Sequence, residues 1–147
     1  MKVAGSYQVS APAEKVWQSL TDPASLSDCI PGCDGLEPYG QDEYKAVMTV
    51  GVGPVKGRYN AKISMLDQKP FTSFRLVVEG SGNTGFVNGE ATITLGERDG
   101  QTTVGVDSDA QVGGPVARVG QRLMDSVATM IMDRFFQCLR ESIESVG

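Results

Sequence analysis

The chain has 147 residues and a formal net charge of −5, which fits one domain with one core and argues against a nucleic-acid-binding surface. It contains no histidine, which excludes the commonest general base, the usual catalytic triads and most zinc sites. No apolar run reaches the roughly 18 residues of a spanning helix, and no apolar signal segment opens the sequence. We therefore expect a cytoplasmic protein with free thiols and with neither cofactor nor metal ion.

The N-terminal quarter predicts one strand and two short helices. Residues 3–9 alternate apolar and polar side chains, which is typical of a strand. Residues 11–20 predict a helix, since a proline lies near its first position and apolar residues recur along one side. Asp22 is a good N-cap for a second helix ending near Ser27, and the Cys-Ile-Pro-Gly-Cys run at 29–33 predicts a turn.

Six consecutive strands are predicted between this turn and residue 112. Each has the two-residue alternation of a sheet with one buried and one solvated face. Short connections between them favour an antiparallel meander. The predicted strands are 36–39, 43–50, 58–66, 73–79, 86–95 and 102–112.

The last stretch, Pro115 to Val146, predicts one long helix, starting after Gly114. Its apolar stripe drifts and broadens along the helix, so that one flat contact would not bury it. A helix gripped by a curved sheet, or roofing a cavity, would bury such a face. We therefore predict a single α+β domain over residues 1–147, a curved antiparallel sheet of about seven strands wrapped round the C-terminal helix.

The inward face of the predicted sheet is rich in small residues and methionines. Small residues either let the helix approach closely or leave room inside. Methionines fill irregular cores and also adapt to variable ligands. The residues that we predict to line a ligand cavity are Met48, Tyr59, Ile63, Met65, Phe74, Leu76, Phe86, Val106, Ser108, Met124, Val127, Ala128, Ile131 and Phe135.

Three glycine-rich connections, at 51–57, 80–85 and 113–115, should share one end of the meander, because alternate loops lie at the same end. None matches a phosphate-binding loop. We expect a mobile mouth there, with Val52, Val55 and Lys56 as contact residues for a membrane surface or a partner protein. The two valines could equally fold back and plug the rim.

Other reactive residues give weaker signals. Cys29 and Cys33 are close in sequence, but a metal site would also need Cys138 and a carboxylate, so buried thiols or a Cys29–Cys33 disulfide under oxidation are favoured. Arg134 lies within the apolar stripe, where it either reaches solvent or holds a polar ligand head. The inward hydroxyl groups of Tyr59 and Ser108 are expected to bond to backbone.

Several motifs together resemble the carbon monoxide dehydrogenase CoxG-like family, within the START and pollen-allergen helix-grip superfamily (SRPBCC). The resemblance implies a hydrophobic cavity between sheet and helix, a lipid or isoprenoid quinone as ligand, and a membrane-linked molybdenum hydroxylase as partner. It also allows peripheral association with the inner face of the membrane. The motifs are Gly5-Ser-Tyr7, the run from Ala11 to Trp17, Asp22-Pro23, the run from Cys29 to Cys33, the Val-Gly-Pro-Val-Lys run ending at Lys56, and Gly120 with Phe135-Phe136.

We interpret the chain as a carrier or accessory protein for an apolar small molecule and not as an enzyme. One alternative is a polyketide cyclase-like or hydrolase-like enzyme on the same fold, which would need convergent acid and base groups inside. The other is an interaction module with a filled core. A cavity of several hundred Å³ would separate the carrier from this last alternative.

Overall fold

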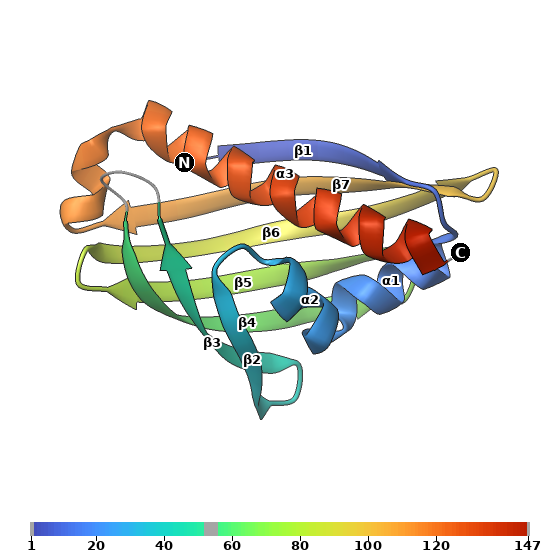
Figure 1. The fold of residues 1–147 in the computed structure, drawn as a ribbon, viewed down its shortest axis with the longest axis horizontal. Coiled ribbons are helices and arrows are strands. Elements are labelled where there is room, and N and C mark those ends of the chain that lie inside the picture. The colour runs from blue at the N-terminus through green and yellow to red at the C-terminus, as the bar shows by residue number, and fades with distance from the viewer. Residues whose placement is uncertain (1, 52–55, 147) are drawn as a thin grey trace.

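The computed structural model describes residues 2–51 and 56–146, with side chains as far as residue 144 (Figure 1). One seven-stranded sheet, three α-helices and one short 3-10 helix make up the fold. In chain order the elements are β1 (Lys2–Val9), α1 (Ala13–Thr21), α2 (Pro23–Cys29), β2 (Cys33–Gly40), β3 (Glu43–Val50), β4 (Gly57–Lys69), β5 (Ser73–Gly82), β6 (Gly85–Arg98), β7 (Gln101–Gly113), η2 (Pro115–Val119) and α3 (Gln121–Val146).

The sheet is antiparallel throughout and has the strand order β1-β7-β6-β5-β4-β3-β2. Strands β2 to β7 form the predicted meander, and β1 pairs beside β7 as the other edge. Figure 1 shows α3 running across one face of the sheet, with α1 and α2 near its C-terminal end. The predicted α+β architecture, a curved sheet around a long C-terminal helix, is confirmed.

Most strands extend further into the turns than the alternation predicts, because the turns are tight. The β6–β7 hairpin pairs Arg98 with Gln101 and leaves only Asp99 and Gly100 between them. These two residues have φ values of 54° and 76°, the left-handed pair of a two-residue hairpin turn. The predicted loop at 80–85 is likewise short, since Gly82 pairs with Gly85.

The two short helices are positioned by a cap and by a close backbone approach. The Asp22 carboxylate accepts hydrogen bonds from Ala24 N and Ser25 Oγ at the start of α2. At the following turn, Gly32 has a φ of 75°, and its carbonyl accepts from the amide of Thr49 at 2.8 Å. A Cβ at Gly32 would lie 2.0 Å from the Thr49 carbonyl oxygen, so only glycine fits.

The main hydrophobic core lies between the sheet, α1 and the C-terminal half of α3. Trp17 of α1 meets Phe74 of β5 edge to face, with ring centroids 5.5 Å apart. Tyr7 of β1 stacks on Phe136 of α3 at 4.2 Å. Fully buried aliphatic residues, among them Leu139, complete this core.

The predicted C-terminal helix is wrong in one respect, because it is two helices. The segment starts at Pro115 as expected, but η2 ends at Val119, and Gly120 with a φ of 94° separates it from α3. The broad apolar face now has a cause, since α3 serves two clusters. Val127 packs with Val116 in a small cluster at its N-terminal end, while the rest of the helix joins the main core.

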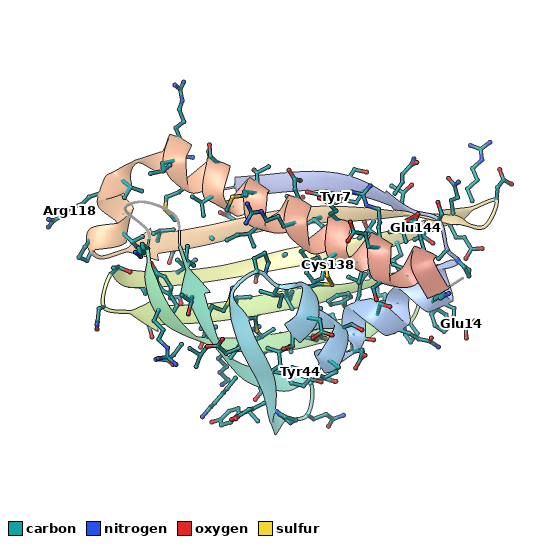
Figure 2. All side chains as sticks on the ribbon, viewed as in Figure 1. Tyr7, Glu14, Tyr44, Arg118, Cys138 and Glu144 are labelled. Carbon is teal, nitrogen blue, oxygen red and sulfur yellow. A yellow bond between two sulfur atoms is a disulfide. The ribbon has the colours of Figure 1, made fainter. Side chains whose placement is uncertain are left out.

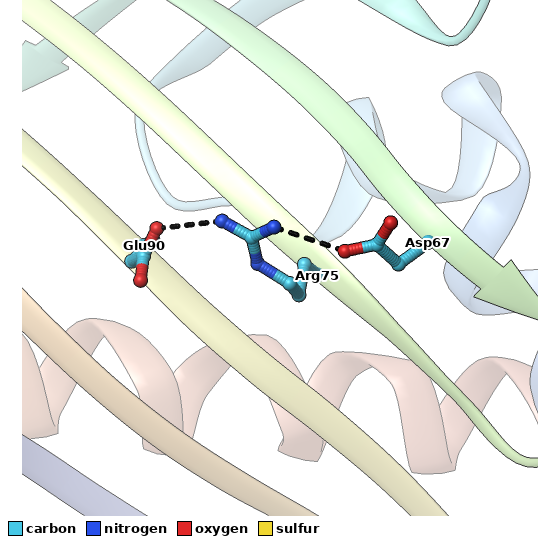
Figure 3. Close-up of polar contacts among 3 residues, drawn as sticks. All are labelled: Asp67, Arg75 and Glu90. Atoms are coloured by element: carbon cyan, nitrogen blue, oxygen red, sulfur yellow. Dashed lines mark hydrogen bonds and ion pairs between the residues drawn. The ribbon is translucent and has the colours of Figure 1, made fainter.

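The outer face of the sheet is polar. Across β4, β5 and β6, the Arg75 guanidinium bridges the carboxylates of Asp67 and Glu90, each at 2.9 Å (Figure 3). All three side chains are substantially exposed, so this bridge contributes little to the free energy of unfolding, roughly 0–1 kcal/mol per pair. The functional features therefore lie on the inner face or at the ends.

Candidate ligand cavity

A cavity of about 390 Å³ lies between the sheet, α3 and the α1–α2 segment. Its size falls within the roughly 300–1,000 Å³ of small-molecule sites. The lining is almost wholly apolar. Its apolar side chains include Leu20, Leu26, Ile30 and Pro31 from the α1–α2 segment, Ile63, Met65, Phe74, Leu76, Val78, Ala91, Ile93 and Val106 from the sheet, and Ala128, Ile131, Met132, Phe135 and Phe136 from α3.

The structure brings nine of the fourteen predicted ligand residues together around this cavity. They come from β4, β5, β7 and α3, so residues distant in sequence share one wall. The nine are Ile63, Met65, Phe74, Leu76, Val106, Ser108, Ala128, Ile131 and Phe135. The remaining five predicted residues do not line the cavity: Met48, Tyr59, Phe86, Met124 and Val127.

The prediction that Phe86 faces inward is wrong. Its neighbours Val87 and Gly89 border the cavity, and strand alternation therefore turns Phe86 outward. It is 42% exposed and lines a separate, more polar hollow on the outer face. A Cβ at Gly113 would lie 2.2 Å from the Phe86 ring, so the ring covers this glycine.

The other four lie beside the cavity, toward the end where the glycine-rich loops meet. Met48 and Tyr59 are cross-strand partners near the end of β3 and the start of β4. The Tyr59 hydroxyl accepts from Thr84 Oγ1 at 2.6 Å, a side-chain contact where backbone was expected. Met124 and Val127 belong to the small cluster around Val116.

The α1–α2 wall was not predicted as part of the site. Leu26, Ile30 and Pro31 close the cavity from the side opposite the sheet. Their sequence signal was only that of two short amphipathic helices and a turn. Nothing local shows that a turn at residue 30 will face α3, because that contact depends on how far the sheet curls.

Few polar groups reach the cavity, and those described have structural roles. Ser108 Oγ donates to the Val3 carbonyl at 2.6 Å, as expected of an inward hydroxyl. Glu90 and Asp109 also border the cavity, but both are exposed on outward strand positions. Arg134 is exposed and does not line the cavity, so it reaches solvent.

One ionisable group at the sheet–helix contact is perturbed. The Tyr7 hydroxyl donates to Asp133 Oδ1 of α3. Burial first, and then this hydrogen bond and the nearby carboxylate charge, raise the pKa of Tyr7 from 10.0 to about 12. The group therefore stays protonated near neutral pH and fastens β1 to α3.

The expectation of three free thiols is wrong. Cys29 of α2 and Cys138 of α3 form a disulfide with a Cα–Cα distance of 5.4 Å, and Cys33 is free. The pairing considered between Cys29 and Cys33 is therefore also wrong. The two bonded residues are 109 positions apart, and their proximity follows from the packing of α2 against α3. Within the described residues, no group of three or more Cys, Asp or Glu side chains could hold a metal ion.

The three glycine-rich connections do meet at one end, as predicted. The Val116 amide donates to the Thr84 carbonyl at 2.6 Å, and Gly57 lies beside the Thr84 side chain. Lys56 is exposed there. The predicted contact residues Val52 and Val55 lie outside the described residues.

Comparison with known proteins agrees with this geometry. The family model for CoxG, described as a component of carbon monoxide dehydrogenase, matches residues 5–144. A crystal structure of a conserved protein from Geobacillus kaustophilus has 40% identity and a TM-score of 0.96, over 99% of this chain and 96% of that one. A comparison with curated proteins finds no match.

More distant structures share the fold alone. A START superfamily protein from Mycobacterium smegmatis has 13% identity and a TM-score of 0.72, over 99% of both chains. A protein from Chromobacterium violaceum has 14% identity and a TM-score of 0.77, over 97% of this chain and 96% of that one. Among the described residues, no helix combines the length and the apolar character needed to cross a bilayer.

The family match spans nearly all of the chain, and the START-like fold places an apolar cavity under the long helix. Together these observations suggest a role in binding a hydrophobic ligand. The chain belongs to the carbon monoxide dehydrogenase CoxG family.

Proposed function

We propose that this protein binds an apolar small molecule, a lipid or an isoprenoid quinone, in the cavity between the sheet and α3. We further propose that it serves a molybdenum hydroxylase of the carbon monoxide dehydrogenase type as a carrier or accessory protein, without catalysing a reaction itself. The observation that carries the proposal is the apolar cavity of about 390 Å³. Such an enclosed apolar volume favours a ligand over a filled structural core.

The chemistry of the lining supports a hydrophobic ligand. Aliphatic and aromatic side chains cover its walls, and each apolar group that a ligand removes from water contributes about 25 cal/mol per Å². The Ser108 hydroxyl already has the Val3 carbonyl as its acceptor. A long apolar tail therefore suits this site better than a compact polar substrate.

The enzyme alternative lacks support from this lining. A cyclase or hydrolase needs acid and base groups aimed at a common point inside the cavity. Tyr59, the inward hydroxyl considered for such a role, lies outside the cavity and contacts Thr84. We expect that Tyr59→Phe changes no activity, and a turnover lost in this variant would support the enzyme alternative instead.

The direct test is binding of a benzoquinone with a ten-carbon tail, followed by tryptophan or quinone fluorescence quenching. Ile131 lines the cavity from α3, so Ile131→Trp should fill it and weaken binding at least about tenfold. Thr129→Trp is the matched control, since it adds the same indole to an exposed position of the same helix. Equal affinity of wild type and Ile131→Trp would contradict the proposal.

The identity of the ligand and of the partner enzyme requires native material. Native mass spectrometry of protein purified from its source should show a lipid or quinone bound to the chain. Pull-down from the same source should recover a molybdenum hydroxylase. Recovery of a ligand-free chain together with unchanged binding by Ile131→Trp would favour the interaction module.

A further inference from the structure

Positive charge is concentrated at one end of the molecule. The segments 56–60, 80–89 and 110–124 meet there, and they contain Lys56, Arg58, Arg118 and Arg122 but no aspartate or glutamate. The other nine basic residues and all 18 carboxylates lie elsewhere, with a formal charge of −9. We call these four side chains the basic end.

All four side chains of the basic end are exposed, and none has an ion-pair partner within the part of the chain that the structure describes. The N-terminus of α3 begins at the same end, at Gln121, and its macrodipole adds partial positive charge. Figure 2 shows Arg118 extending from this end, whereas Glu14 and Glu144 lie at the opposite one. An anionic surface would therefore orient the molecule with this end toward it.

The basic end is also the end nearest a purely aliphatic closure of the cavity. Ile131 lines the cavity and at the same time packs against the cluster of Val116 and Val127. This cluster separates the cavity from η2, which carries Arg118. An apolar ligand leaving in this direction would meet only aliphatic side chains, and the aromatic ring of Phe86 is 42% exposed beside Gly113.

We propose that the basic end docks on a lipid bilayer containing anionic headgroups. The described residues contain no helix suited to spanning a bilayer, so the contact is made at the surface by charge and by an exposed aromatic side chain. An apolar ligand is stored in a bilayer rather than in water, which favours a bilayer over an acidic protein as the occupant. This purpose rests on the proposed function, but the docking itself is measurable without any ligand.

The test is co-sedimentation of the full chain with vesicles of phosphatidylcholine alone or with about 30% phosphatidylglycerol, an anionic lipid. Wild type should bind only the anionic vesicles, and binding should disappear at high salt, where the screening length falls to about 3 Å at 1 M. Each basic side chain near such a surface contributes about fivefold to partitioning, so Arg118→Gln with Arg122→Gln should cost about 25-fold. Arg118→Glu with Arg122→Glu should cost more.

The matched control reverses two charges at the opposite end. Lys69→Glu with Arg98→Glu changes the net charge equally, at exposed turn residues of the β4–β5 and β6–β7 connections. This pair should retain binding within about threefold. Equal losses in both pairs would reduce the effect to net charge and overturn the proposal, as would absence of wild-type binding to anionic vesicles at low salt.

Quinone quenching separates this proposal from the proposed function. The Arg118→Glu, Arg122→Glu variant should bind the ten-carbon quinone in solution like wild type, because neither residue lines the cavity. If wild type binds vesicles but no quinone, the docking surface stands and the carrier function fails. If it binds quinone and an acidic protein but no anionic vesicle, the docking proposal fails alone.

Discussion

Cys29 at the end of α2 is bonded to Cys138 in the C-terminal half of α3, across the side of the cavity that faces away from the sheet. Residues on the same two elements, Leu26 and Phe135, line that cavity. Figure 2 shows Cys138 on the side of α3 that faces α2. The bond thus holds one wall of the cavity against its roof.

The disulfide should contribute strongly to stability. It closes a loop of 109 residues, for which chain-entropy reasoning gives about 4–5 kcal/mol, with measured disulfides in the range of about 2–5 kcal/mol. Cys138→Ser should lower the free energy of unfolding by about 2–5 kcal/mol in urea melts, and a reductant should destabilise wild type but not the variant. Cys33→Ser is the control, because Cys33 is free. A melt of wild type unmoved by reductant would contradict the pairing.

Tyr7 should make stability decline at high pH. Its pKa is about 12 in the folded protein, against about 10 in an unfolded chain. The folded state therefore keeps its proton between these values while the unfolded state loses it, so this contribution is complete below about pH 10 and falls as pH rises toward about 12. Tyr7→Phe should remove the component that ionises near pH 12 in an ultraviolet titration. A titration in which no tyrosine ionises above about pH 11 would contradict this environment.

A buried hydroxyl joins β7 to the segment before α1. Thr102 is fully buried, and its Oγ1 donates to the Ala11 carbonyl at 2.7 Å. Thr102→Val keeps the shape and leaves that carbonyl without its donor, which should cost about 1–3 kcal/mol in thermal or urea unfolding. Thr103→Val, at the exposed neighbouring position, should change stability by no more than about 0.5 kcal/mol. Similar losses in both variants would count against the hydrogen bond.

Two glycines with the same backbone conformation should respond differently to alanine. Gly32 and Gly100 have φ values of 75° and 76°. A Cβ at Gly32 would collide with the Thr49 carbonyl, whereas none of the surrounding atoms lies within 4 Å of one at Gly100. Gly100→Ala should cost only the left-handed strain of about 1–2 kcal/mol, and Gly32→Ala clearly more. Calorimetric melting of both variants measures the difference, and equal shifts would show that the turn at Gly32 relaxes freely.

Much of the fold was predictable because its signals are local. The two-residue alternation from Tyr44 to Val112 determined the strands and their inner faces. Short turns then left the meander as the simple arrangement, and loop parity placed the glycine-rich connections at one end. The drifting apolar stripe of α3 indicated more than one contact surface, which the two clusters at Val127 and Leu139 explain.

The errors arose where a local pattern does not determine a distance in space. Alternation itself turned Phe86 outward, and the exposed position follows from its pairing with Ser81. Gly120 interrupts the C-terminal helix although the apolar period continues through it. Sequence spacing gave no measure of how closely Cys29 and Cys138 approach.

The sequence by itself determined the elements, their order and the apolar character of the inner face, since these follow from side-chain period and turn chemistry. Only the tertiary structure decided which inner residues border the cavity and which pack at its end. That choice depends on how far the sheet curls toward α3 and where α2 comes to rest. Curvature and helix placement are summed over many long-range contacts, so no short stretch of residues encodes the cavity formed by Leu26, Phe74 and Ile131.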